Sequence, residues 1–78
     1  MYALEIKETV RVMKNTVRVE RAILDITQQQ LADAIGVSRN TINSIESGRY
    51  VPSTVLALKI ARYFGKPADS IFTLEEGD

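Results

Sequence analysis

A predicted pair of short helices between Thr27 and Tyr50 constrains the fold of this chain more than any other segment. The first helix opens with a capping-box spacing, in which Thr27 and Gln30 can satisfy each other's free backbone amides. Gly36 then stands where the end of a helix favours a left-handed residue without a Cβ atom. Ser38 can cap a second helix two residues later. The segment therefore predicts two helices joined by a tight turn.

Apolar residues at helical spacing give both predicted helices an inward face. Leu31 and Ile35 lie on one side of the first helix, and Ile42 and Ile45 lie on one side of the second. Ala32 is small at a point where a crossing helix would come close. The second helix is polar on its outer side, so its inner side packs against the core and its outer side faces away.

Helical spacing and capping residues extend this pattern through most of the chain. Five helices are predicted, over residues 17–24, 28–35, 39–47, 53–64 and 67–72. Val17, Ile23 and Leu24 are the residues of the first helix that are available to the core. A chain of 78 residues holds one small core. We therefore expect an all-α domain over residues 13–78, preceded by an extension of residues 1–12.

The extension allows three interpretations. Its apolar residues alternate with charged ones, as in a strand, and residues 10–12 could then pair with a C-terminal strand over residues 71–75 in a two-stranded β ribbon. Alternatively, one helix face could hold the four apolar residues Tyr2, Ile6, Val10 and Met13. A tail without fixed structure is the third interpretation. The sequence therefore predicts the five helices and leaves open whether a β ribbon accompanies them.

Composition excludes several classes of function. The chain has no cysteine and no histidine, so disulfides, the usual zinc sites and the common nucleophile–base pairs cannot be built. We expect no enzyme activity, no catalytic residue, no metal, no cofactor and no small-molecule substrate. No apolar run approaches the roughly 20 residues that span a bilayer, and the start of the chain does not resemble a signal peptide. The expected location is the cytoplasm, without a membrane partner.

The charges are segregated along the chain, although its net charge is zero. Residues 38–66 hold five basic residues and one acid, for a net charge of +4. Residues 67–78 hold four acids and no base, for a net charge of −4. Nucleic-acid binders need Lys and Arg to neutralise phosphates. The neutral total thus conceals a basic middle segment and an acidic tail.

The outer face of the helix over residues 39–47 has the chemistry of a DNA reader. Asn and Ser lower helix propensity, whereas a merely solvated face usually carries Glu and Lys. Arg pairs bidentately with guanine, Asn pairs with adenine, and Ser can bond either base. The predicted base-reading residues, which would enter the major groove, are Arg39, Asn40, Asn43 and Ser44.

The whole pattern resembles the helix-turn-helix signature of the Xre-type, phage-repressor-like DNA-binding proteins. The resemblance continues through residues 48–53 and 57–72 and covers roughly residues 14–74. It implies a compact five-helix regulator, most simply a repressor, that binds a palindromic operator in double-stranded DNA as a homodimer. An antitoxin-like or co-regulatory protein-interaction module with the same fold stays the alternative. The signature consists of Gln28, Leu31, Ala32, Ile35, Gly36, Val37, Ile42, Ile45 and Glu46.

The same resemblance implies roles for residues around the base-reading helix. Arg21 and Glu46 correspond to a structural salt bridge between the first and third helices. Glu20 departs from the family, which usually has an apolar residue at that position. Helix N-termini attract anions, and phosphate contacts fix the register of a DNA-binding helix. The residues expected to bind phosphate are Gln28, Gln29, Thr41, Arg49 and Tyr50.

A dimer is expected because one recognition helix of about nine residues contacts too few base pairs to select a site in a genome. The chain also has apolar residues beyond the needs of a small core, on a second face of the helix over residues 53–64 and near the C-terminus. The predicted dimer interface comprises Val55, Leu58, Ile71, Phe72 and Leu74.

Overall fold

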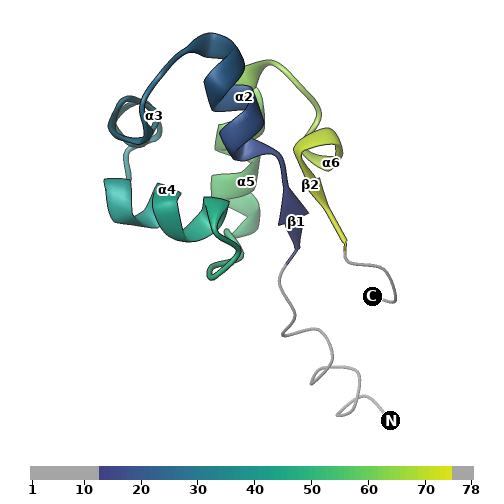
Figure 1. Cartoon of the computed structure of the whole chain (residues 1–78). Helices are drawn as coiled ribbons and strands as arrows, with labels where there is room; N and C mark the ends of the chain where they lie inside the picture. The colour runs from purple at the N-terminus through teal and green to yellow at the C-terminus, as the bar shows by residue number, and fades with distance from the viewer. Residues whose placement is uncertain (1–12, 75–78) are drawn as a thin grey trace, which may run out of the picture.

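The computed structural model describes residues 13–74, which form five helices and a two-stranded antiparallel sheet (Figure 1). The predicted five-helix fold is confirmed, and so is a ribbon between the two ends of the domain. In chain order the elements are β1 (Lys14–Asn15), α2 (Val17–Leu24), α3 (Gln28–Ile35), α4 (Arg39–Glu46), α5 (Thr54–Phe64), α6 (Ala68–Ile71) and β2 (Phe72–Thr73).

Local chemistry sets the ends of the central helices. Thr27 and Gln30 form the complete capping box at the start of α3, each side chain accepting the other residue's backbone N–H. Gly36 ends α3 at φ +91°, a left-handed conformation in which a Cβ atom would be strained. Ser38 and Ser53 accept backbone N–H groups at the starts of α4 and α5. The turn between α3 and α4 is therefore determined by residues within a few positions of it.

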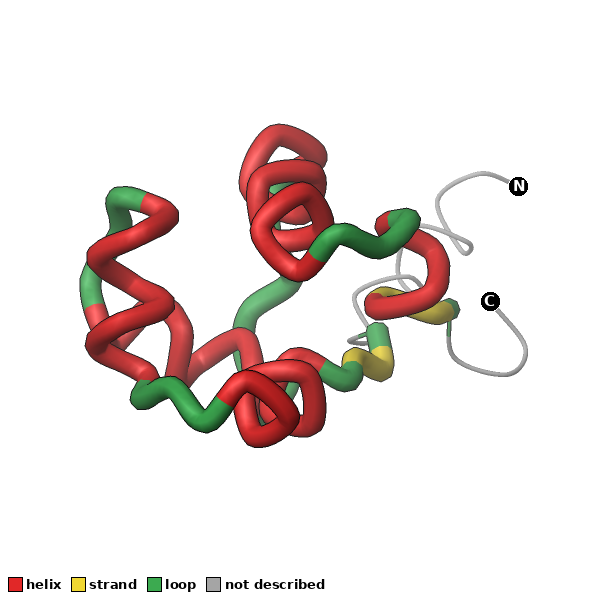
Figure 2. Tube along the Cα trace, turned by 90° about the horizontal axis from the view of Figure 1, so that it is seen from above, coloured by secondary structure: helices red, strands yellow, loops and turns green. Residues whose placement is uncertain are grey.

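The core lies between α5 and the other helices. In both views α3 and α4 occupy one side of the molecule, and α6 with the β ribbon occupies the other (Figures 1 and 2). Every helix contributes buried apolar side chains to this core. The inner side of α4 is therefore packed against the core, while its outer side is exposed to solvent. The buried apolar side chains are Val17, Leu31, Ala32, Ile35, Ile42, Ile45, Leu56, Ile60, Ala61, Ile71 and Phe72.

The first helix corrects part of the predicted core. Val17 is fully buried, but Ile23 is 66% exposed and Leu24 is 49% exposed, so the prediction that these two contribute to the core was wrong. The inward position one turn after Val17 belongs instead to Glu20, which is buried. Its Oε2 lies 2.7 Å from the Nζ of Lys66. Glu20 is therefore buried at a position where the family usually has an apolar residue, and its charge is paired with that of Lys66.

The ribbon forms with a different N-terminal strand from the predicted one. Lys14 pairs with Thr73, and Asn15 pairs with Phe72. The predicted strand over residues 10–12 lies outside the described residues. Asn15 also fixes the ribbon to α4, because its Nδ2 donates to the carbonyl oxygen of Ile45 at 2.9 Å.

The ribbon and α6 contain two residues that were predicted to lie at a dimer interface. Ile71 is fully buried and Phe72 is 6% exposed, so both belong to the core of the single domain and that part of the prediction was wrong. Val55, Leu58 and Leu74 are each more than half exposed. Only these three of the predicted interface residues are free to contact another molecule.

Candidate nucleic-acid interface

The first turn of α4 carries the most accessible of the predicted base-reading residues. Arg39 and Asn40 are exposed, whereas Asn43 and Ser44 are half-buried one turn later. Ile42 and Ile45 anchor the inner side of the helix in the core. The N-terminal end of α4 therefore exposes the guanidinium of Arg39 and the carboxamide of Asn40. The packing of Ile42 and Ile45 fixes the helix backbone that carries them.

Gln28, at the start of α3, links that turn to the rest of the domain. Its Nε2 donates to Asn43 Oδ1 at 3.3 Å and to Glu46 Oε1 at 3.1 Å. Its Oε1 accepts from Arg39 Nη1 at 3.4 Å. Both protons of the Gln28 amide thus point to partners on α4, and its oxygen holds the guanidinium of Arg39.

The carboxylate of Glu46 is the buried end of this network. Its side chain is fully buried and receives Arg21 in a bidentate arrangement, with Nε at 2.8 Å from Oε2 and Nη2 at 3.2 Å from Oε1. Burial alone would raise the pKa of Glu46, but the hydrogen bonds from Arg21 and Gln28, with the charges of Arg21 and Arg18, outweigh it and lower that pKa. Glu46 is therefore held as a carboxylate that links α4 to Arg21 of α2 and to Gln28 of α3.

Arg21 has a second structural role at the end of α2. Its Nη1 donates to the carbonyl oxygen of Ile26 at 2.8 Å, just before α3 begins. The hydrogen bond to Glu46 raises the pKa of Arg21, against the opposing effect of burial. Arg18 also lies near Glu46, with its Nε 3.8 Å from Oε1, but its side chain is 71% exposed. Sequence reasoning identified the pair of Arg21 and Glu46 and missed Arg18.

The predicted phosphate-binding residues lie at the starts of α3 and α4 and just after the end of α4. Gln29 at the start of α3 is exposed and donates to Asp33 at 2.8 Å. Thr41 is half-buried, and its hydroxyl lies 3.0 Å from that of Ser38 at the start of α4. Both residues belong to the first turns of their helices, where the first backbone amides have no partner within the helix.

Arg49 and Tyr50 follow the other end of α4. Arg49 Nη2 lies 3.4 Å from Ser44 Oγ, and Tyr50 is 44% exposed. The structure thus brings one predicted phosphate contact, Arg49, beside one predicted base-reading residue, Ser44.

Within residues 13–74, no group of three acidic, His or Cys side chains could hold a metal ion. No helix in that range has both the length and the apolar character needed to cross a membrane.

Comparisons with known proteins agree with this geometry. A helix-turn-helix family profile matches residues 17–71. An uncharacterised HTH-type transcriptional regulator of Methanocaldococcus jannaschii is 47% identical over 66 residues, which cover 85% of this chain and 100% of the relative. A similar regulator of Bacillus subtilis is 45% identical over 64 residues, covering 82% and 97% of the two chains.

A repressor and a solved structure extend the comparison. The cryptic phage CTXphi transcriptional repressor RstR of Vibrio cholerae is 38% identical over 50 residues, covering 64% of this chain and 42% of RstR. The crystal structure of a candidate DNA-binding protein from Bacteroides fragilis superposes with a TM-score of 0.71 at 28% identity, covering 78% and 98% of the two chains. The chain therefore belongs to the Xre-type helix-turn-helix family of DNA-binding transcriptional regulators.

Proposed function

We propose that this regulator is a repressor that binds a palindromic operator as a homodimer, with α4 in the major groove. The observation that carries the proposal is the exposed pair of Arg39 and Asn40 at the first turn of α4, with Arg39 hydrogen-bonded to Gln28. A guanidinium that is already oriented loses less side-chain entropy when it pairs with a guanine. The similarity to a protein named as a phage transcriptional repressor supports repression as the outcome.

The four base-reading candidates divide into two pairs by their exposure. Arg39 and Asn40 are open to a base edge without rearrangement. Asn43 already accepts a hydrogen bond from Gln28, so its own Nδ2 group is the part left to donate to a base. The hydroxyl of Ser44 accepts from Arg49, so it can turn toward a base only after that hydrogen bond breaks. We therefore assign most of the sequence preference to the first pair.

Phosphate contacts are proposed on both sides of α4. The first-turn amides of α3 have no helical partner and are suited to an anion. Gln28 contributes there through its backbone, because its side-chain protons are bonded to Asn43 and Glu46. Gln29 and Thr41 are the other contacts on this side, and Arg49 and Tyr50 supply those after α4. Such contacts position the protein on DNA without reading its sequence.

The homodimer is proposed to form through the surface of Val55, Leu58 and Leu74, here called the dimer surface. These side chains are 64%, 55% and 67% exposed. Beside Leu58 is a groove of about 290 Å³, lined also by Ala57 and Phe72. Exposed apolar side chains beside such a groove are typical of a surface that another protein covers. Two protomers related by a two-fold axis would present two α4 helices to half-sites about one helical turn apart.

Selection of bound duplexes from a random DNA pool tests the proposal. We expect an enriched motif with two-fold symmetry and half-sites about 10 base pairs apart, centre to centre. An enriched motif without symmetry would contradict the homodimer but keep sequence-specific binding. A pool without any enrichment would contradict sequence-specific binding itself. Transcription in vitro from a promoter that overlaps the selected site should then fall as protein is added, and an increase would contradict repression.

A further inference from the structure

Arg18, in the first turn of α2, holds a charged group that is mostly open to solvent. Its side chain is 71% exposed, and its Nε lies 3.8 Å from Oε1 of Glu46. That distance allows an ion pair but no hydrogen bond. A guanidinium has five N–H donors, and within residues 13–74 no group accepts a hydrogen bond from Arg18. All of its donors are therefore available to a partner from outside the domain.

The carboxylate of Glu46 cannot take up these donors. Its Oε1 already accepts from Arg21 Nη2 at 3.2 Å and from Gln28 Nε2 at 3.1 Å, and its Oε2 accepts from Arg21 Nε at 2.8 Å. A carboxylate oxygen has two lone pairs, so Oε1 is fully occupied. Ion pairs at an exposed side chain contribute little to stability. The contact with Glu46 therefore gives Arg18 only a small structural role.

Positive charge is in excess around this carboxylate. The guanidinium groups of Arg18 and Arg21 both lie next to Glu46. Arg39 bonds the Gln28 amide, which donates to the same carboxylate. Three cations thus share one carboxylate in this network, and Arg18 and Arg39 are its exposed members. The network therefore attracts an anion from outside the domain.

The position of Arg18 matches the edge of a DNA major groove. Gln28, the first residue of α3, connects the two exposed guanidinium groups. Its Oε1 accepts from Arg39, and its Nε2 approaches the same Glu46 oxygen as Arg18. The groove is about 12 Å wide. With Arg39 on a base edge, a cation beyond the Gln28 amide is therefore at the wall of the groove, where the phosphates are.

We propose that Arg18 binds a DNA phosphate beside the start of α3, so that the DNA-binding surface includes α2. This proposal rests on the DNA binding proposed above. The planar guanidinium suits the contact, because its N–H groups can bond two oxygens of one phosphate. Glu46 attracts the guanidinium before DNA binds and so limits the positions that it takes. The contact holds α4 in register without reading a base.

Anisotropy titrations of full-chain variants at several salt concentrations test the contact. Arg18→Ala should weaken binding to the selected operator and to a scrambled duplex alike, by about fivefold to tenfold at about 100 mM salt. It should also lower the salt slope by about 0.9, as expected for one lost phosphate contact. Arg18→Lys keeps the charge and should keep the slope.

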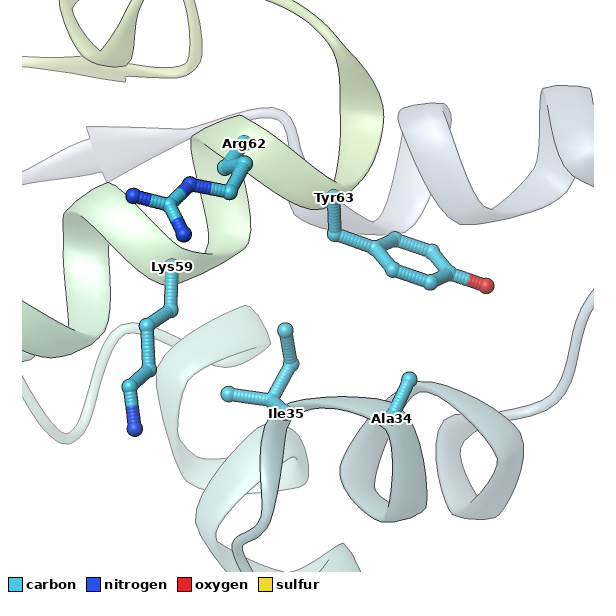
Figure 3. A pocket seen from close by; sticks show the side chains of 5 residues that line it. All are labelled: Ala34, Ile35, Lys59, Arg62 and Tyr63. Atoms are coloured by element: carbon cyan, nitrogen blue, oxygen red, sulfur yellow. The ribbon is translucent and has the colours of Figure 1, made fainter.

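Arg62→Ala is the matched control, because it removes an exposed arginine at the other end of α3. Figure 3 shows Arg62 projecting from α5 beside a cavity of about 310 Å³, which Ala34 and Ile35 of the last turn of α3 also line. Arg18 lies by the first residue of α3 instead. Arg62→Ala should therefore keep the affinity and the salt slope close to those of the wild type.

Neutral phosphates locate the contact on the DNA. In operators that carry one methylphosphonate at a time, at least one position should weaken binding of the wild type and have no further effect on Arg18→Ala. A different position should show this coupling to Arg49→Ala, because Arg49 follows the other end of α4. The coupled position identifies the phosphate that Arg18 binds.

The outcomes separate this contact from a structural role and from the proposed function. An unchanged salt slope in Arg18→Ala would overturn the contact, and so would a scan in which no methylphosphonate couples to Arg18. A loss confined to the operator would also overturn it, because a phosphate contact acts on both duplexes. A lower free energy of unfolding in Arg18→Ala, with the slope unchanged, would assign Arg18 to the fold. A wild type that binds neither duplex would overturn the proposed function itself.

Discussion

Arg21 and Glu46 form a bidentate ion pair that joins α2 to α4, with N–O distances of 2.8 and 3.2 Å. The Glu46 side chain is fully buried and that of Arg21 is 18% exposed. A buried carboxylate without its partner is costly, because its desolvation is no longer offset. The pair therefore links α4 to α2, the first helix of the domain.

Removing one member of the pair should destabilise the fold. We expect Arg21→Ala to lower the free energy of unfolding by about 3 kcal/mol, measured by urea denaturation. The double variant Arg21→Ala/Glu46→Ala should lose clearly less than the sum of the two single changes. Arg18→Ala is the control, because its exposed contact should contribute at most about 1 kcal/mol. Simple additivity across the cycle would show that the two residues do not stabilise each other.

The lowered pKa of Glu46 predicts that stability falls in acid. A carboxyl whose pKa is lower in the folded than in the unfolded state contributes stability above its unfolded pKa, about 4.3. That contribution is lost as the pH falls through the lower, folded value. Melts below about pH 5 should show a smaller pH dependence for Glu46→Gln than for the wild type. In Arg21→Ala, burial raises the pKa of Glu46 with less opposition, so the loss of stability in acid should also be smaller than in the wild type. Unchanged slopes in both variants would refute the role of Glu46.

Gln28 is expected to act on DNA binding through Arg39. In Gln28→Ala the guanidinium loses its acceptor at 3.4 Å, so affinity for the operator should fall by about 1 kcal/mol. The same change made in an Arg39→Ala background should cost much less, since no guanidinium is left to orient. Gln29→Ala is the matched control and should show no such coupling. Equal losses from Gln28→Ala in both backgrounds would indicate that Gln28 contacts DNA by itself.

The dimer surface predicts which apolar changes alter assembly. Leu58→Asp and Leu74→Asp should raise the dimer Kd by tenfold or more, since each buries a charge at the interface, while thermal melts stay close to those of the wild type. Val19→Asp is the control: Val19 is 55% exposed on α2, outside the dimer surface. In analytical ultracentrifugation at micromolar concentration, a wild type that sediments as an 8.7 kDa monomer, free and on its operator, would exclude the dimer.

The capping and turn residues within α3 and α4 predicted these two helices and the turn between them well. The capping box of Thr27, the left-handed Gly36 and the cap at Ser38 each depend on residues within a few positions, so the turn between α3 and α4 could be predicted. The exposure of Asn40 follows from its spacing to the buried Ile42 and Ile45. That of Arg39 follows from its place at the start of the helix.

The sequence predictions that the structure corrected concern contacts between residues that are far apart in the chain. Glu20 is buried because Lys66, 46 residues away, pairs with it, and no spacing rule connects these positions. Ile23 and Leu24 are apolar and so available to the core, yet α2 packs through the side of Val17 and Glu20. The partners of Gln28 on α4 also depend on how two helices cross, which sequence spacing does not specify.

Base reading by the first turn of α4 is the central claim, and anisotropy titrations on the selected operator and on a scrambled duplex test it most directly. Arg39→Ala and Asn40→Ala should each weaken operator binding by roughly 1–3 kcal/mol more than scrambled binding, and so lower the specificity ratio. Arg49→Ala is the control: it should weaken both duplexes alike, keep the ratio and reduce the salt slope by about 1. If Arg39→Ala and Asn40→Ala both leave the ratio of operator to scrambled affinity unchanged, α4 does not read the sequence through these residues.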